Sequence, residues 1–141
     1  LSLHDALPIY ARLIEPTNVF EGRRLSFNHI VLRPHLYFHL RNPRTPSWGE
    51  PYEAIANRML EAIAEIWQNT NDGDAVVVSH QLPIWMVHQR LAGQPLPHNP
   101  KKRRCALSSI TSFERDKSGK FVEVEYRDPA SHIKSIDLGA I

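Results

Sequence analysis

One histidine of the sequence stands where an anion could be bound. His80 follows the apolar run at residues 75–78 and Ser79, and the residues after it have the pattern of a helix. In open α/β sheets ligands bind beyond the carboxyl ends of strands, and the free N–H groups at a helix N-terminus favour anions. A protonated histidine held there can donate a hydrogen bond to the anion. The same position also suits a histidine with a purely structural role.

Two glutamates, Glu15 and Glu21, flank residues 16–20 near the start of the sequence. A carboxyl group that leaves a strand into a loop can serve as a general acid if burial raises its pKa. The alternative is a solvated glutamate in a loop, which is the commoner environment of this residue type.

The first element that must position these groups is a helix. Apolar residues recur at three- and four-residue steps, which predicts an amphipathic helix: Ile55, Met59, Ile63 and Ile66. Ser47 and Glu50 have the spacing of a capping box at its start. The turn-rich residues 71–74 place its end near Asn69.

A strand–turn–helix unit and a hairpin make up most of the remaining chain. The β-branched run at residues 75–79 is typical of a buried parallel strand. A second helix follows, with Pro83 near its first position and Gly93 as its stop. Residues 105–114 and 121–126 predict two strands of a hairpin. This order predicts an α/β fold, a mostly parallel sheet flanked by helices, with an antiparallel edge.

Length and composition bound the class of protein. The 141 residues suit one domain, and 42% hydrophobic with 23% charged residues is the composition of a soluble globular chain. A net charge of +2 gives no reason to expect a nucleic acid or a membrane as partner. Cys105 is the single cysteine, so the sequence offers neither an internal disulfide nor a cysteine zinc site, and we expect a cytoplasmic location.

Three motifs follow one another along the chain. They are Leu13-Ile14-Glu15 with Phe20-Glu21-Gly22, then Trp48-Gly49-Glu50 with Arg58 downstream, and finally Val77-Val78-Ser79-His80. Their order and spacing resemble those of the histidine phosphatase superfamily, the phosphoglycerate mutase-like proteins, from about Leu13 to about Phe113.

The resemblance implies phosphoryl transfer. In this family a nucleophilic histidine forms a phosphohistidine, two arginines and a second histidine neutralise the phosphoryl oxygens, and a glutamate protonates the leaving oxygen. His80 then corresponds to the second histidine and Glu15 to the proton donor. Asn18, Arg23 and Gln81 are the expected contacts to a small phosphorylated substrate, and the resemblance implies no metal or organic cofactor. Gln81 stands where the family usually has glycine, which adds bulk near the phosphate.

One part of the family's pattern has no counterpart in the sequence. The nucleophile belongs to an Arg-His-Gly motif on the first strand, and the chain contains no Arg-His dipeptide. The opening Leu-Ser-Leu-His-Asp-Ala-Leu-Pro-Ile matches the translation of a common sequencing adapter, which makes Tyr10 a hybrid codon. We therefore expect residues 1–10 to be non-native. Residues 11–141 are then the C-terminal part of a single histidine phosphatase domain, incomplete at its N-terminal side and inactive by itself.

Two groups of residues suggest other ligands. His29, His35 and His39 invite a metal site, but no ligand set of suitable spacing completes it. Residues 101–104 form a basic run without interleaved aromatic residues, which is typical of a solvated loop rather than a nucleic-acid surface. One cation of this run could also lie near a phosphorylated substrate.

Structural alternatives accompany the motif residues as well. Glu50 could simply cap a helix, and Arg58 could pair with a carboxylate instead of touching substrate. For the protein as a whole, the alternative to an enzyme is a phosphate-binding pseudoenzyme or interaction module of the same fold.

Overall fold

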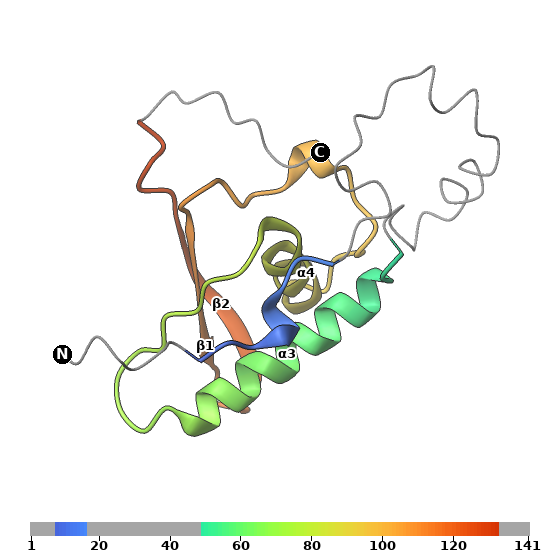
Figure 1. The fold of residues 1–141 in the computed structure, drawn as a ribbon. Helices are drawn as coiled ribbons and strands as arrows, with labels where there is room; N and C mark the ends of the chain where they lie inside the picture. Colours follow the sequence, from blue (N-terminus) through green and yellow to red (C-terminus); the bar gives the residue numbers. More distant parts are fainter. Residues whose placement is uncertain (1–7, 17–48, 133–141) are drawn as a thin grey trace, which may run out of the picture.

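The computed structural model describes residues 8–16 and 49–132 (Figure 1). Its elements, in chain order, are the short 3-10 helix η1 (Ala11–Leu13), the helices α3 (Tyr52–Asn69) and α4 (Gln81–Leu91), the 3-10 helix η3 (Pro100–Lys102) and the strands β1 (Ile110–Arg115) and β2 (Phe121–Arg127). The predictions that concern Asn18, Arg23, the histidines at 29, 35 and 39, and Ser47 lie outside the described residues.

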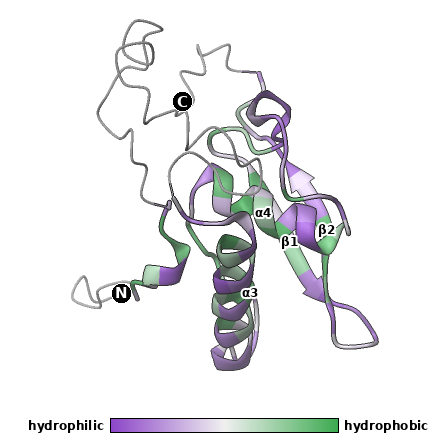
Figure 2. Cartoon of the chain, turned by 90° about the vertical axis from the view of Figure 1, so that its right-hand side faces the viewer, coloured by the Kyte–Doolittle hydropathy of each residue, from purple (hydrophilic) through white to green (hydrophobic). Residues whose placement is uncertain are grey.

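The helix α3 ends where the sequence predicts but begins later. Its end at Asn69 is confirmed, whereas the capping box is wrong, because the residue at the N-cap is Pro51 and no side chain caps the helix. The ring of Pro51 disfavours the α conformation of the preceding residue, Glu50, so the helix begins after this proline. Its buried face consists of Tyr52, Ile55, Ala56, Met59 and Ala62. In Figure 2 hydrophilic and hydrophobic positions alternate around α3, as in an amphipathic helix.

The core lies between α3 and α4. The predicted second helix is confirmed: Pro83 lies in its first turn, and Gly93 adopts a φ of 65°, which suits a residue without Cβ just past a helix end. From α4 the core takes Leu82, Pro83, Trp85, Met86 and Val87. Leu13 of η1 is buried in the same cluster, which places the start of the described chain against these helices.

A hairpin covers one side of this helix pair. Strands β1 and β2 pair antiparallel with an irregularity between Ser112 and Phe113, so the predicted hairpin is confirmed. The first strand begins at Ile110 rather than at Cys105, because Ser108 adopts a φ of 63° and breaks the extended chain. Trp67 of α3 meets the ring of Phe121 edge-on at 5.7 Å between centroids.

The parallel sheet is not found among the described residues, whose sheet has two antiparallel strands. The prediction of a buried strand at residues 75–79 is wrong for this structure: Val76 and Val78 expose 91% and 86% of their surface. A parallel strand is buried only when strands flank it and helices cover its faces. No described segment lies alongside this one as a strand.

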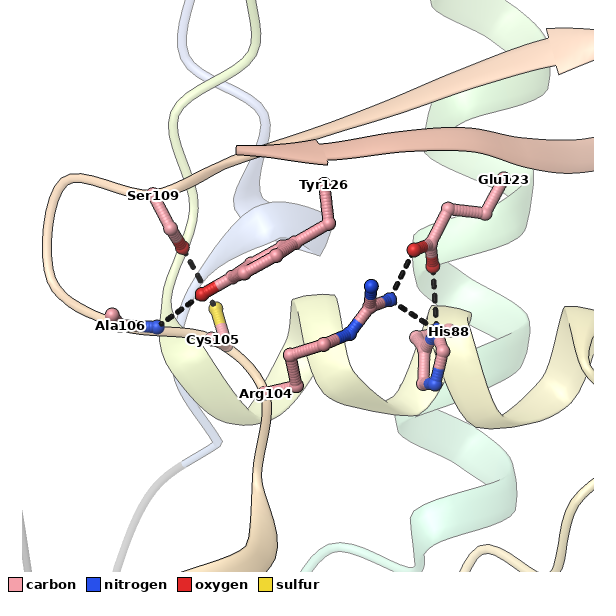
Figure 3. A network of polar contacts seen from close by, with 7 residues as sticks. All are labelled: His88, Arg104, Cys105, Ala106, Ser109, Glu123 and Tyr126. Atoms are coloured by element: carbon pink, nitrogen blue, oxygen red, sulfur yellow. Dashed lines mark hydrogen bonds and ion pairs between the residues drawn. The ribbon is translucent and has the colours of Figure 1, made fainter. Parts of the chain in front are cut away.

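A polar network fastens the chain after η3 to α4 and β2 (Figure 3). Glu123 of β2 lies 2.5 Å from Nδ1 of His88 on α4 and forms an ion pair with Arg104. The Arg104 guanidinium lies over the ring of Tyr126 at 4.5 Å, and the Tyr126 hydroxyl accepts a hydrogen bond from the N–H of Ala106. These contacts fix the position of residues 104–106.

In the parts of the chain that the structure describes, none of the helices has both the length and the apolar character that a bilayer crossing requires.

Candidate functional site

The fold brings together the two residues that were expected to carry the chemistry. His80 is the N-cap residue of α4 and has an extended backbone. Its Nδ1 lies 3.9 Å from Oε2 of Glu15, which follows η1. The two side chains are 53% and 41% exposed, so a ligand can reach both of them. Their proximity is a finding, whereas the catalytic roles of Glu15 and His80 stay predictions.

Two hydrogen bonds hold the segment that carries Glu15 in place. The hydroxyl of Ser79 donates to the carbonyl oxygen of Leu13 at 2.7 Å. The Arg58 guanidinium donates to the carbonyl oxygen of Arg12 and, through Nε and Nη2, to both carboxylate oxygens of Glu50 at 2.8 and 3.0 Å. Arg58 therefore pairs with a carboxylate, as one interpretation of the sequence suggested. The orientation of Glu15 depends on backbone contacts made by residues from α3 and from the end of the valine run.

The environment of Glu15 favours its protonated form. Burial raises the pKa of this carboxyl group, and the nearby His80, Arg103 and Arg58 oppose that effect without cancelling it. A carboxyl group that keeps its proton to higher pH than usual is what a proton donor to a leaving oxygen requires. The raised pKa is therefore compatible with the proton-donor role predicted for Glu15.

Gln81, the third expected site residue within the described part, has a structural partner. Its Nε2 donates to the carbonyl oxygen of Cys105 at 2.8 Å, so the carboxamide joins the first residue of α4 to the chain after η3. Its contact to substrate stays a prediction. Cys105 itself is buried, and burial raises the pKa of its thiol, which disfavours the reactive thiolate.

The sequence analysis missed one residue of this region. Lys101 and Lys102 are exposed, as expected for a solvated basic run, but Arg103 is half-buried. Its Nε donates to Nε2 of His98 at 2.8 Å, and burial lowers the pKa of the guanidinium while Tyr52 and Glu15 oppose that shift. The only sequence signal was that one cation of the run could lie near a phosphorylated substrate.

Metal ligation has no support in the described ranges 8–16 and 49–132, where no cluster of three or more His, Cys, Asp or Glu side chains could hold an ion. The histidines at 29, 35 and 39 lie outside those ranges, so the metal interpretation of them is untested.

Comparison with known proteins places the chain in a family. Residues 12–128 match the histidine phosphatase superfamily (branch 1), and the chain belongs to this superfamily. Its fold class is therefore α/β, of the phosphoglycerate mutase-like kind, and members of the superfamily are generally phosphatases or mutases. The resemblance of the three sequence motifs to this family is thus confirmed.

Two relatives from Mycobacterium tuberculosis match most of the chain. The uncharacterized protein Rv0525 of strain ATCC 25618 / H37Rv is 45% identical over 120 residues, and the uncharacterized protein MT0547 of strain CDC 1551 / Oshkosh is 44% identical over 120 residues. Each alignment covers 84% of this chain and 59% of the relative, so the chain spans about three fifths of the length of these relatives. No solved structure matches the chain.

Proposed function

We propose that the whole protein is a phosphoryl-transfer enzyme, a phosphomonoester hydrolase or phosphomutase that acts through a phosphohistidine. One observation carries the proposal: a carboxyl group with a raised pKa, Glu15, lies 3.9 Å from the imidazole of His80 at the N-terminus of α4. An anion next to His80 would also face the first N–H groups of the helix, where negative charge is stabilised.

In this proposal the two residues have different tasks. The His80 imidazolium donates a hydrogen bond to a non-bridging oxygen of the phosphoryl group and offsets its charge. The nucleophilic histidine attacks phosphorus, the bond to the ester oxygen breaks, and that oxygen takes the proton of Glu15. In the second step the oxygen of water, or of a second hydroxyl group, attacks phosphorus and the phosphorus–nitrogen bond breaks. The Glu15 carboxylate accepts the proton of that attacking oxygen.

The nucleophile is assigned to residues that precede Ala11 in the whole protein, because the chain has no Arg-His dipeptide. Residues 1–10 would then be translated adapter, and residues 11–141 would lack turnover when produced alone. The substrate would be a small phosphomonoester, since the proposed site consists of the Glu15–His80 pair at the N-terminus of α4.

Two steps test the proposal. Sequencing upstream of the codon for Ala11 should reveal an Arg-His-Gly triplet at the end of a predicted strand. The whole protein should then hydrolyse p-nitrophenyl phosphate, and His80→Ala should lower kcat by about 100-fold or more. His132→Ala is the matched control, because His132 is exposed in the turn after β2.

The results separate the enzyme from its alternative. Full turnover in the His80→Ala variant would remove His80 from the site. An upstream frame without Arg-His-Gly, in a protein that still binds phosphate, would favour the non-catalytic phosphate-binding module.

A further inference from the structure

The guanidinium of Arg103 has a buried hydrogen-bond donor, Nη2, without an acceptor in the described part of the chain. Its Nη2 is inaccessible to solvent and has no hydrogen-bond partner among the residues that the structure describes. Leaving a buried donor unpaired costs free energy, and the cost is larger when the group is charged. A ligand oxygen that accepts from Nη2 would recover that cost.

Contacts made by its neighbours position the backbone at Arg103, which has φ −66° and ψ 124° at the end of η3. The next residue, Arg104, is held by Glu123 and the ring of Tyr126 in the network of Figure 3. Gln81 holds the carbonyl of Cys105 beside the start of α4. The backbone that follows Arg103 is therefore fixed beside the start of α4.

His98 orients the guanidinium of Arg103 without using Nη2. Nδ1 of His98 lies 2.7 Å from the carbonyl oxygen of Leu96, an acceptor, so Nδ1 carries the proton and Nε2 has a free lone pair. That lone pair accepts the bond from Nε of Arg103 at 2.8 Å. Burial lowers the pKa of His98, which keeps the ring neutral and able to accept.

Arg103 also lies close enough to Glu15 for the two charges to stabilise each other, since each of them shifts the pKa of the other. Yet no ion pair joins them in the described ranges, where Oε2 of Glu15 lies 3.9 Å from Nδ1 of His80. Arg103, Glu15 and His80 therefore lie in one region of the fold: Glu15 is 3.9 Å from His80, and Gln81, the residue after His80, holds the carbonyl of Cys105, two positions beyond Arg103.

We infer that Arg103 is a further phosphate-binding residue, whose Nη2 donates to a non-bridging oxygen of the phosphoryl group held next to His80 and Glu15. The inference rests on the proposed function. Arginine suits this task because its guanidinium is permanently charged and its donors match the geometry of phosphate oxygens. Arg103 would add to the cations that neutralise the phosphoryl group, and it comes from a segment in which no phosphate ligand was expected.

The experiment uses the 141-residue chain with inorganic phosphate as the probe. Binding is followed by the shift of the His80 ring resonances and by the rise in Tm that a ligand of the folded state produces. Arg103→Gln should weaken phosphate binding by about ten-fold or more, the loss expected for a charge-assisted hydrogen bond. Lys102→Gln, which removes the same charge from the adjacent exposed position, should change it by less than about two-fold.

A purely structural role for Arg103 predicts a different outcome. In that case Arg103→Gln would lower Tm without phosphate and leave the phosphate-dependent rise intact. Our inference predicts that the phosphate-dependent rise is lost. Tm without phosphate is not the deciding quantity, because Arg103→Gln removes both the unpaired donor Nη2 and the hydrogen bond from Nε to His98. Equal losses of affinity in Arg103→Gln and Lys102→Gln would also overturn the inference.

His80→Ala separates this inference from the proposed function. If His80→Ala abolishes phosphate binding and Arg103→Gln does not, the role of Arg103 is wrong and the proposed site stands. If Arg103→Gln weakens binding and His80→Ala does not, phosphate binds elsewhere and both are wrong. If the unaltered chain shows no response to phosphate up to about 0.1 M, the inference is overturned, and turnover of the whole protein decides on the proposed function separately.

Discussion

The hydroxyl of Ser79 donates a hydrogen bond to the carbonyl oxygen of Leu13 at 2.7 Å and so joins two segments that lie 66 positions apart in the sequence. His80 directly follows the donor, and Glu15 lies two residues beyond the acceptor. The hydrogen bond from Ser79 to Leu13 therefore sets the distance between the His80 imidazole and the Glu15 carboxyl group. The attraction between these two partly exposed side chains is weak by comparison.

Removal of the Ser79 hydroxyl should disturb both stability and the site. Ser79→Ala is expected to lower the free energy of unfolding by about 1 kcal/mol, the usual net value of one hydrogen bond. It should also weaken the phosphate-dependent shift of the His80 resonances, because Glu15 loses its fixed position. Urea unfolding and a phosphate titration would measure the two effects.

Ser118→Ala provides the control for that substitution. The Ser118 hydroxyl donates to Asp116 in the exposed turn of the hairpin. Its loss should change the free energy of unfolding by less than about 0.5 kcal/mol and leave the titration unchanged. Equal effects of the two substitutions would show that the Ser79 contact has no special role.

The Arg58 guanidinium should be hard to replace even by lysine. Its side chain is 18% exposed and donates to both oxygens of Glu50 and to the carbonyl of Arg12. An ammonium group cannot reproduce this planar set of donors. Arg58→Lys should therefore lower the free energy of unfolding by about 1–3 kcal/mol, as measured by chemical denaturation.

The matched control is Arg90→Lys on α4. Arg90 pairs with Glu53, but that carboxylate is 69% exposed, so the pair is largely screened by water. A change of less than about 0.5 kcal/mol is expected there. Comparable losses in the two variants would contradict the structural importance that we assign to Arg58.

The titration of Glu15 should occur above the usual carboxyl pKa of 4.5, because burial disfavours the carboxylate. Carbon-13 NMR of the side-chain carboxyl resonance measures it directly. Arg103→Gln should raise this pKa further, since the arginine stabilises the charged form. A titration at or below 4.5 would remove the physical basis for Glu15 as a proton donor.

The same shift has a consequence for stability. Because the folded-state pKa of Glu15 lies above its unfolded value, the contribution of this group to stability is present below pH 4.5 and is lost as the pH rises through the folded-state value. Glu15→Gln should therefore stabilise the protein near neutral pH, with a benefit that fades in acid. Unfolding curves of both proteins at several pH values would show whether the difference narrows.

His98 should make stability depend on pH in the opposite direction. Burial places its folded-state pKa below the ordinary 6.5. The unfolded chain therefore binds the proton more readily, and stability is lost as the pH falls from 6.5 through the lower folded-state value. Protonation would also remove the acceptor for Arg103. His98→Asn should reduce the loss of unfolding free energy between about pH 7.5 and pH 5.5; an unchanged loss would assign it to other groups.

Local patterns in the sequence predicted the helices and the hairpin better than they predicted the sheet. The apolar spacing in α3, the stop at Gly93 and the two strands of the hairpin depend on neighbours a few residues away, and all three appear in the structure. The start of α3 was missed because a single proline outweighs the capping pattern. Residues 75–79 were misjudged because burial depends on which segments lie alongside, and composition does not reveal that.

The site was predictable in part. Glu15 and His80 were named together from a family resemblance, and the structure places them in proximity without testing their chemistry. Arg103 could not be chosen from four adjacent cations by sequence, because its burial depends on the position of His98 and on the contacts that hold Arg104. The sequence of residues 101–104 therefore gives no sign that one of these four cations is more buried than the others.

The open valine run at residues 76–78 has a consequence for handling the molecule in solution. Its residues are exposed to between 39% and 91%, so they present an apolar surface to another chain. Folding is first order in protein, whereas association through such a run is of higher order, so dilute refolding favours monomers and concentrated refolding favours aggregates. A lysine at position 76 or 78 should widen the range of concentrations over which monomers are recovered.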